Sequence, residues 1–158
     1  MKLILVRHGE SAHNRGYKVA GDENNLTAVG VVQAIKLAEN LKDQKFSAVY
    51  CSPKPRCVQT LDEILRVRDD DMPIHLTSLV NHKKRSENYE DLKDRVELFL
   101  DDLRFDHKPD DTILIISHLT TIEMISYLQT DNKRRLENGQ MVEVELSEKT
   151  VVKELLEK

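Results

Sequence analysis

Short apolar runs without interleaved polar residues constrain this sequence most. They occupy residues 3–6, 48–50 and, most strongly, 112–116. A strand that is covered on both faces of a parallel sheet has this pattern, because neither face meets water. The segments between the runs have helical periodicity instead. Strands that alternate with helices predict an α/β fold with three layers, α/β/α, and a mainly parallel central sheet.

Four segments carry apolar residues at the spacing of one helix face. These segments are residues 28–41, 55–67, 87–103 and 120–128. Thr27 suits the N-cap of the first segment, since a threonine hydroxyl can accept a hydrogen bond from the first turn. Pro55 suits the first turn of the second segment. We therefore predict four helices.

The C-terminal part of the chain has a different pattern. Residues 141–146 alternate apolar and acidic side chains, residues 147–149 have turn character, and residues 150–152 resume the apolar pattern. Alternation is typical of a strand with one exposed face, so we predict a hairpin at the edge of the sheet. The sequence contains no repeat and no low-complexity linker, and residues 1–158 are predicted to form a single domain.

The charge balance limits the partners that we expect. The chain has 24 Lys and Arg against 28 Asp and Glu, a formal net charge of −4. Nucleic-acid binding depends on a basic face and is therefore disfavoured, although a local basic pocket remains compatible with this composition. Cys51 and Cys57 lack the spacing of a zinc site, and no apolar stretch approaches the roughly 20 residues of a membrane helix. We expect a cytoplasmic protein without metal or membrane contact.

Residues suited to anion chemistry follow three of the predicted strands. Arg7 and His8 come directly after the first run, Arg56 follows the second, and His118 follows the strongest. Ligands of parallel sheets bind beyond the carboxyl ends of the strands, so these side chains are expected at one end of the sheet. Two adjacent guanidinium groups are costly to bury unless an anion lies between them. The pattern therefore predicts a phosphoryl site.

The same residues suggest a reaction. A neutral imidazole of His8 can attack phosphorus and form a phosphohistidine, which water then hydrolyses. The nearby arginines disfavour the imidazolium form and keep His8 neutral. His118 can donate a hydrogen bond to the oxygens on which charge develops.

A series of short motifs, spread in order along the whole chain, resembles the motifs of a known family. They are Leu5-Val6-Arg7-His8-Gly9-Glu10-Ser11 with Asn14, Gly21-Asp22, Leu26-Thr27, Gly30, Gln33-Ala34, Ser52-Pro53, Arg56, Gln59-Thr60, Ser117-His118 and Asn138-Gly139. This pattern resembles the histidine phosphatase superfamily, which has the phosphoglycerate-mutase-like fold. The resemblance implies that His8 becomes phosphorylated. It also implies that Arg7, Arg56 and His118 complete the phosphate pocket.

The resemblance implies further contacts around the phosphate. Asn14 and the backbone N–H of Leu119 would bind phosphate or substrate, and the family uses neither a metal nor an organic cofactor. Leu119 itself stands where most members of the family have glycine. This departure is similar to the SixA-type phosphohistidine phosphatases.

A second departure bears on the substrate. Many family members carry a glutamate as general acid in a Leu-x-Glu segment, whereas residues 79–81 here read Leu-Val-Asn. Glu87 and His82 are the two candidates for a displaced proton donor, although a glutamate in this position also suits the start of a helix. A phosphoramidate leaving group can depart without a positioned acid, but an alkoxide cannot do so readily.

We therefore predict a metal-independent phosphatase that forms a phosphohistidine on His8. Its substrate, and its only predicted partner, is a phosphorylated protein or small molecule, with phosphohistidine or another phosphorylated protein preferred. The first alternative is a phosphoglycerate-type mutase or small-metabolite phosphomonoesterase that uses Glu87 or His82 as proton donor. The second alternative is a non-catalytic module that binds phosphate.

Overall fold

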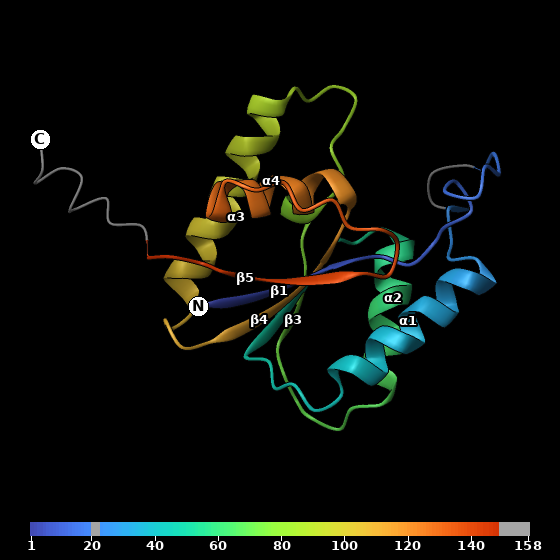
Figure 1. The fold of residues 1–158 in the computed structure, drawn as a ribbon, viewed down its shortest axis with the longest axis horizontal. Helices are drawn as coiled ribbons and strands as arrows, with labels where there is room; N and C mark the ends of the chain where they lie inside the picture. The colour runs from blue at the N-terminus through green and yellow to red at the C-terminus, as the bar shows by residue number, and fades with distance from the viewer. Residues whose placement is uncertain (20–22, 149–158) are drawn as a thin grey trace, which may run out of the picture.

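The computed structural model describes residues 1–19 and 23–148 and has three layers. Figure 1 shows α1 and α2 on one face of a central sheet and α3 and α4 on the other. The α/β/α fold predicted from the sequence is confirmed. Among the described residues, no helix is both long enough and apolar enough to span a bilayer.

Within the described residues, the sheet contains five strands in the order β3-β2-β4-β1-β5. The strands are β1 Lys2–Arg7, β2 Ala48–Cys51, β3 Ile74–Leu76, β4 Thr112–Ser117 and β5 Met141–Glu145. The strands β3, β2, β4 and β1 run parallel to their neighbours in this order, and β5 runs antiparallel to β1. Arg7 pairs with Ser117 in the parallel register, so β1 and β4 end side by side. The mainly parallel sheet is therefore confirmed.

The predicted helices are present with small changes at their ends. They are α1 Ala28–Leu41, α2 Pro55–Arg66, α3 Tyr89–Asp106 and α4 Leu119–Thr130, and a short 3₁₀ helix, η2, covers Ser78–Val80. Thr27 caps α1 by accepting a hydrogen bond from the Gly30 N–H at 3.1 Å. Asn88 caps α3 through a capping box with Asp91, so this helix begins two residues after the predicted start.

The core consists of two clusters, one on each face of the sheet. Ile113 and Ile115 of β4 pack with α3 and α4, while Leu114 and Ile116 of the same strand pack with α1 and α2. All four side chains are fully buried. Because both faces of β4 are covered, its sequence shows the continuous apolar run instead of alternation.

The C-terminal edge agrees with the prediction as far as it is described. In β5, Val142 and Val144 are buried while Met141, Glu143 and Glu145 are exposed, which is the alternation expected of an edge strand. The returning strand predicted at residues 150–152 lies outside the described residues. The strand β3 was not predicted, because it has only three residues and all of them are exposed, so it shows no hydrophobic pattern.

Candidate active site

The carboxyl ends of β1, β2 and β4 bring Arg7, His8, Arg56 and His118 into one cavity of about 260 Å³. Arg7 ends β1, Arg56 lies in the first turn of α2, and His118 is the N-cap of α4. The lining residues are Arg7, His8, Ser11, His13, Asn14, Asn24, Arg56, His82, Lys83, His118, Leu119 and Thr120. Sequence and topology therefore converge on the same site.

The His8 ring is buried and has one defined tautomer. Its Nδ1–H donates to the Gly9 carbonyl at 2.7 Å, which leaves the lone pair on Nε2. Burial, and then the charges of Arg56 and Arg7, lower the pKa of His8 to about 3. At neutral pH His8 is therefore an uncharged imidazole with a nucleophilic Nε2.

Neither Arg7 nor Arg56 forms an ion pair with a carboxylate in the described part of the chain. Arg7 donates from Nη1 to the Leu136 carbonyl at 2.9 Å, and its buried Nε finds no hydrogen-bond partner among these residues. Arg56 is buried and lies with Nη2 3.4 Å from Nδ1 of His118. Burial lowers the pKa of both arginines. A buried guanidinium group and a half-buried one, neither paired with a carboxylate, can together hold a doubly charged anion.

His118 is oriented by a serine and an asparagine. The Ser52 hydroxyl donates to Oδ1 of Asn81 at 2.7 Å, so its oxygen accepts from Nε2–H of His118 at 2.9 Å. Nδ1 of His118 then carries the lone pair and faces Arg56. The His118 ring lies 5.2 Å from the His8 ring, measured between centroids. Burial, together with the charges of His8 and Arg56, holds the pKa of His118 far below its ordinary value.

His82 lies in the cavity, whereas Glu87 does not line it. The His82 ring is 5.4 Å from the His118 ring, and its buried Nδ1 has no partner in the described residues. Burial, then Arg56 and Lys54, lower the pKa of His82. Of the two candidate proton donors, the structure brings only His82 to the phosphate pocket.

Glu87 instead forms an ion pair with Arg95. Both of its carboxylate oxygens accept from Arg95, at 2.9 and 2.8 Å, and this bond is the main reason that the pKa of Glu87 falls to about 2. Arg95 in turn donates to the carbonyls of Leu79, Asn81 and His82. The ion pair therefore fixes the loop that carries His82, and a carboxylate with so low a pKa is a poor proton donor at neutral pH.

The loop after His8 is braced by two asparagines. Oδ1 of Asn14 accepts from the N–H and the hydroxyl of Ser11 and from Nδ2 of Asn138. Asn138 Nδ2 also lies 3.3 Å from the His8 carbonyl, and the Gly139 N–H donates to that carbonyl at 3.1 Å. Asn14 and Leu119, which are predicted to contact phosphate or substrate, both line the cavity.

Sequence reasoning gave no roles to Ser52, Asn81 and Asn138. Ser52 and Asn138 do belong to the family motifs, and each follows a strand end or precedes a strand, which is the available signal. The hydrogen bonds from Ser52 to Asn81 and from Asn138 to the His8 carbonyl join residues that are 29 and 130 positions apart, so these bonds depend on the tertiary fold. The described residues contain no cluster of three or more His, Cys, Asp or Glu side chains that could hold a metal ion.

Comparisons with known proteins identify the family of this chain and several similar sequences. The model of the histidine phosphatase superfamily (branch 1) matches residues 3–81, half of the chain. A probable phosphatase of Schizosaccharomyces pombe is 37% identical over 82 residues, which cover 51% of this chain and 28% of the relative. A 2,3-bisphosphoglycerate-dependent phosphoglycerate mutase of Bacteroides fragilis is 36% identical over 86 residues, 52% of this chain and 35% of the mutase. These matches span less than half the length of either relative.

The fold also matches solved structures. The protein histidine phosphatase SixA, complexed with tungstate, superposes with a TM-score of 0.73 over 90% of this chain and 86% of that chain. The sequence identity is 19%, so this match supports the fold alone.

Proposed function

The chain belongs to the histidine phosphatase superfamily, and we propose that it is a metal-independent phosphatase that works through a phosphohistidine on His8. The observation that carries this proposal is the buried, uncharged His8 imidazole beside Arg7 and Arg56, neither of which forms an ion pair within the described residues. Membership of the family implies a phosphorylated substrate. Because the described helices pack on one sheet, we infer that residues 1–158 act as a single catalytic domain.

The proposed reaction has two displacement steps. In the first, Nε2 of His8 forms a bond to phosphorus while the bond between phosphorus and the leaving group breaks. In the second, water attacks phosphorus, the bond to Nε2 breaks, and inorganic phosphate leaves. Arg7 and Arg56 neutralise the phosphoryl oxygens in both steps, which is the main form of catalysis available to phosphoryl transfer.

Three further residues complete the proposed pocket. The negative charge of a bound phosphoryl group raises the proton affinity of His118, whose Nδ1 then donates to a phosphoryl oxygen. The backbone N–H of Leu119 belongs to the first turn of α4, where helix N–H groups lack partners inside the helix. Asn14 uses its oxygen for the His8 loop, and its amide Nδ2 is the group that contacts phosphate or substrate.

The substrate class that we propose is a phosphoamidate, with phosphohistidine in a protein as the preferred form. Asn81 stands at the position of the family's glutamate acid, and its side chain is already engaged with Ser52. An imidazole leaving group departs without a positioned acid, so this site suits it.

A second candidate is hydrolysis or transfer of alcohol esters with His82 as the proton donor. The position of His82 in the cavity favours it, because a histidine near a bound phosphate can gain a proton and pass it to an alkoxide. The likeness to a phosphoglycerate mutase is compatible with this candidate.

A substrate panel tests the proposal. The wild-type protein and the His8→Ala variant are incubated in the presence of a chelator with a phosphohistidine-containing protein, 3-phosphoglycerate and a sugar phosphate, and released phosphate is measured. We expect turnover of the phosphohistidine protein that the substitution abolishes, while the His75→Ala control, an exposed residue of β3, retains it. A preference for the alcohol esters would favour the second candidate, and turnover by His8→Ala would refute the mechanism.

A further inference from the structure

A second cavity adjoins the phosphate pocket. It has a volume of about 300 Å³ and lies along α4 beside the first residue of α3. Its lining residues, which we call the tyrosine groove, are Tyr89, Thr120, Glu123, Met124, Tyr127 and Lys133. Thr120 lines both the groove and the catalytic cavity, so the two hollows adjoin at this residue.

The groove leads away from the reacting phosphoryl group along one helix face. Thr120, Met124 and Tyr127 are four and three residues apart, which places them on the same side of α4. At 1.5 Å per residue, the seven steps along the helix from Thr120 to Tyr127 cover about 10 Å. This length corresponds to about three residues of extended polypeptide at 3.3 Å each. A compact phosphorylated metabolite held at His8 would not reach the far end.

The side chains of the groove suit an apolar group with acidic neighbours. Tyr89 and Tyr127 are 66% and 43% exposed, so their rings are available for contact. A lysine lies over each ring, Lys83 at 5.3 Å from Tyr89 and Lys133 at 5.9 Å from Tyr127. The groove carboxylate, Glu123, is already paired with Arg135 at 3.2 Å. Lys83 makes the end of the groove at Tyr89 basic, and Lys133 makes the end at Tyr127 basic, although the whole chain has a net negative charge.

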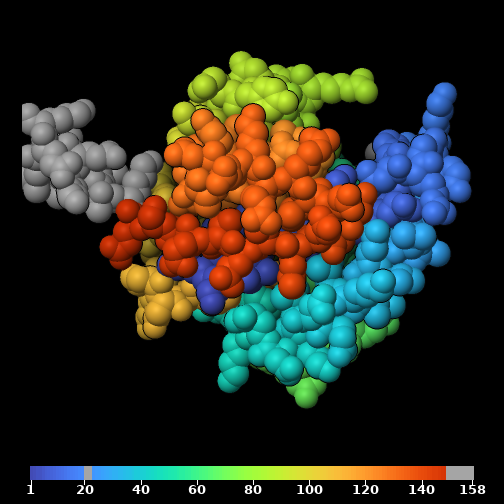
Figure 2. Space-filling view, viewed as in Figure 1, coloured from blue at the N-terminus to red at the C-terminus, as the bar shows by residue number. Residues whose placement is uncertain are grey.

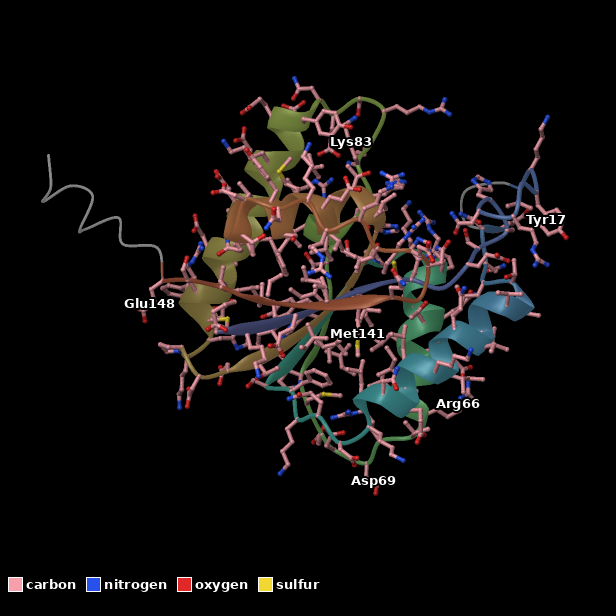
Figure 3. The ribbon with its side chains drawn as sticks, in the orientation of Figure 1. Tyr17, Arg66, Asp69, Lys83, Met141 and Glu148 are labelled. Carbon is pink, nitrogen blue, oxygen red and sulfur yellow. The ribbon has the colours of Figure 1, made fainter. Side chains whose placement is uncertain are left out.

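The views of the molecule agree with this arrangement. Figure 2 shows α4 at the surface with the start of α3 directly beside it. Figure 3 shows Lys83 on the loop that leads into α3, above α4. Lys83 also lines the phosphate pocket, so the basic end of the groove is shared with the catalytic cavity.

We propose that the tyrosine groove binds the polypeptide that flanks the phosphorylated residue of a protein substrate. An apolar side chain close to that residue packs between Tyr89, Met124 and Tyr127, and acidic residues on either side meet Lys83 and Lys133. This inference rests on the proposed phosphatase function and narrows its substrate class to phosphorylated protein segments with this pattern. Exposed tyrosines that surround a hollow are typical of surfaces that hold a partner's side chain.

The test compares peptides that differ only in the flanking residues. Two phosphohistidine peptides of about seven residues are used, one with leucine and glutamate around the phosphohistidine and one with glycine and serine, together with phosphoramidate as the small substrate. kcat/KM is measured for the wild type, for the double variant Tyr89→Ala/Tyr127→Ala, and for Phe105→Ala. Phe105 is the matched control, because its ring is 90% exposed at the other end of α3.

We expect the leucine peptide to exceed the glycine peptide by about tenfold in kcat/KM, which corresponds to roughly 1.4 kcal/mol. The double variant should remove this preference, and Phe105→Ala should keep it. Equal kcat/KM for the two peptides on the wild type would overturn the proposal. So would an equal loss by the double variant for the leucine peptide and for phosphoramidate.

Binding separates this proposal from the catalytic one. A fluorescent copy of the leucine peptide is titrated with the His8→Ala protein, with and without the tyrosine substitutions. Absence of turnover on every substrate would refute the phosphatase function alone. Weaker binding after the tyrosine substitutions would then still support the groove, and equal binding would overturn it.

Discussion

At the scale of single residues, the site combines side chains that the sequence predicts with others that only the fold reveals. Arg7 and His8 are adjacent in the chain at a strand end, so their place could be predicted. The role of Ser52 could not, because its partners Asn81 and His118 come from two other connections in the fold. The same holds for Glu87, whose tie to Arg95 makes it a positioning residue and separates it from the phosphate pocket.

The first prediction concerns the serine that orients His118. In Ser52→Ala, Nε2 of His118 loses its acceptor, and the ring is no longer held with Nδ1 toward Arg56. We expect kcat to fall by about tenfold, in line with the loss of an orienting hydrogen bond, with a smaller change in KM. Ser52→Thr should restore part of kcat, and the exposed Ser78→Ala serves as control. A wild-type kcat in Ser52→Ala would show that His118 needs no such support.

The second prediction concerns the Glu87–Arg95 ion pair. The Glu87 side chain is 14% exposed, and Glu87→Gln removes a charged acceptor from Arg95. We expect the free energy of unfolding to fall by about 1 kcal/mol at pH 7. Because the folded-state pKa is lowered to about 2, this contribution is complete above the ordinary carboxyl pKa and is lost as the pH falls toward 2. Urea denaturation measures this change in the free energy of unfolding, with the exposed Glu148→Gln as control. An equal decrease in the two variants would contradict a stabilising role of the ion pair.

At the scale of elements, the parallel topology explains why one end of the sheet carries the chemistry. β1, β2 and β4 all end at the same edge, and α2 and α4 start there. Periodicity and capping predicted α1 with its observed limits, because Thr27 and the apolar stripe are local signals. β3 and η2 gave no such signal, since they are three residues each and are fixed by packing against β2 and α3.

The third prediction concerns the contact between α1 and the His8 loop. A Cβ added at Gly30 would meet the Glu10 carbonyl, and one added at Gly9 would lie 2.5 Å from the Gly30 carbonyl. Alanine usually stabilises a helix relative to glycine by about 0.5–1 kcal/mol. We expect Gly30→Ala instead to cost roughly 1–3 kcal/mol by overpacking and to lower kcat by shifting the loop.

Thermal and urea unfolding, with turnover, test this contact. The exposed Val32→Ala on α1 is the control and should change stability by less than about 0.5 kcal/mol. A stabilised and fully active Gly30→Ala protein would mean that the loop tolerates the added methyl group.

At the scale of the whole molecule, a chain with net charge −4 encloses a basic site. Composition allowed such a pocket and could not locate it, since location depends on the order of the strands. The apolar runs were sufficient to predict the three layers, because the two core clusters cover both faces of each central strand. The tyrosine groove on α4 was not predictable, because Tyr89 belongs to α3, which is distant from α4 in the sequence.

The fourth prediction is a dependence of global stability on pH. Burial is the main reason that the pKa values of His8 and His118 are lowered, that of His8 to about 3. In the unfolded chain both groups take up protons near pH 6.5, whereas in the folded protein they stay neutral to much lower pH. Stability is therefore complete above pH 6.5 and decreases below it, by up to about 1.4 kcal/mol per pH unit for each histidine.

Urea denaturation at pH 7.5 and pH 5.5 measures this dependence. We expect a lower free energy of unfolding at pH 5.5 and a weaker dependence in His8→Gln, while the exposed His75→Ala keeps the wild-type dependence. Equal stability at the two pH values would contradict the burial of neutral histidines.

In the proposed mechanism, Nε2 of His8 carries the phosphoryl group during turnover. Its most direct test is to quench the wild-type protein with alkali in the first turnover of a phosphohistidine substrate, digest it, and locate the phosphoryl group by mass spectrometry. We expect an acid-labile phosphoryl group on the peptide that contains His8. A phosphoryl group on His118, on His82 or on any other residue would contradict it.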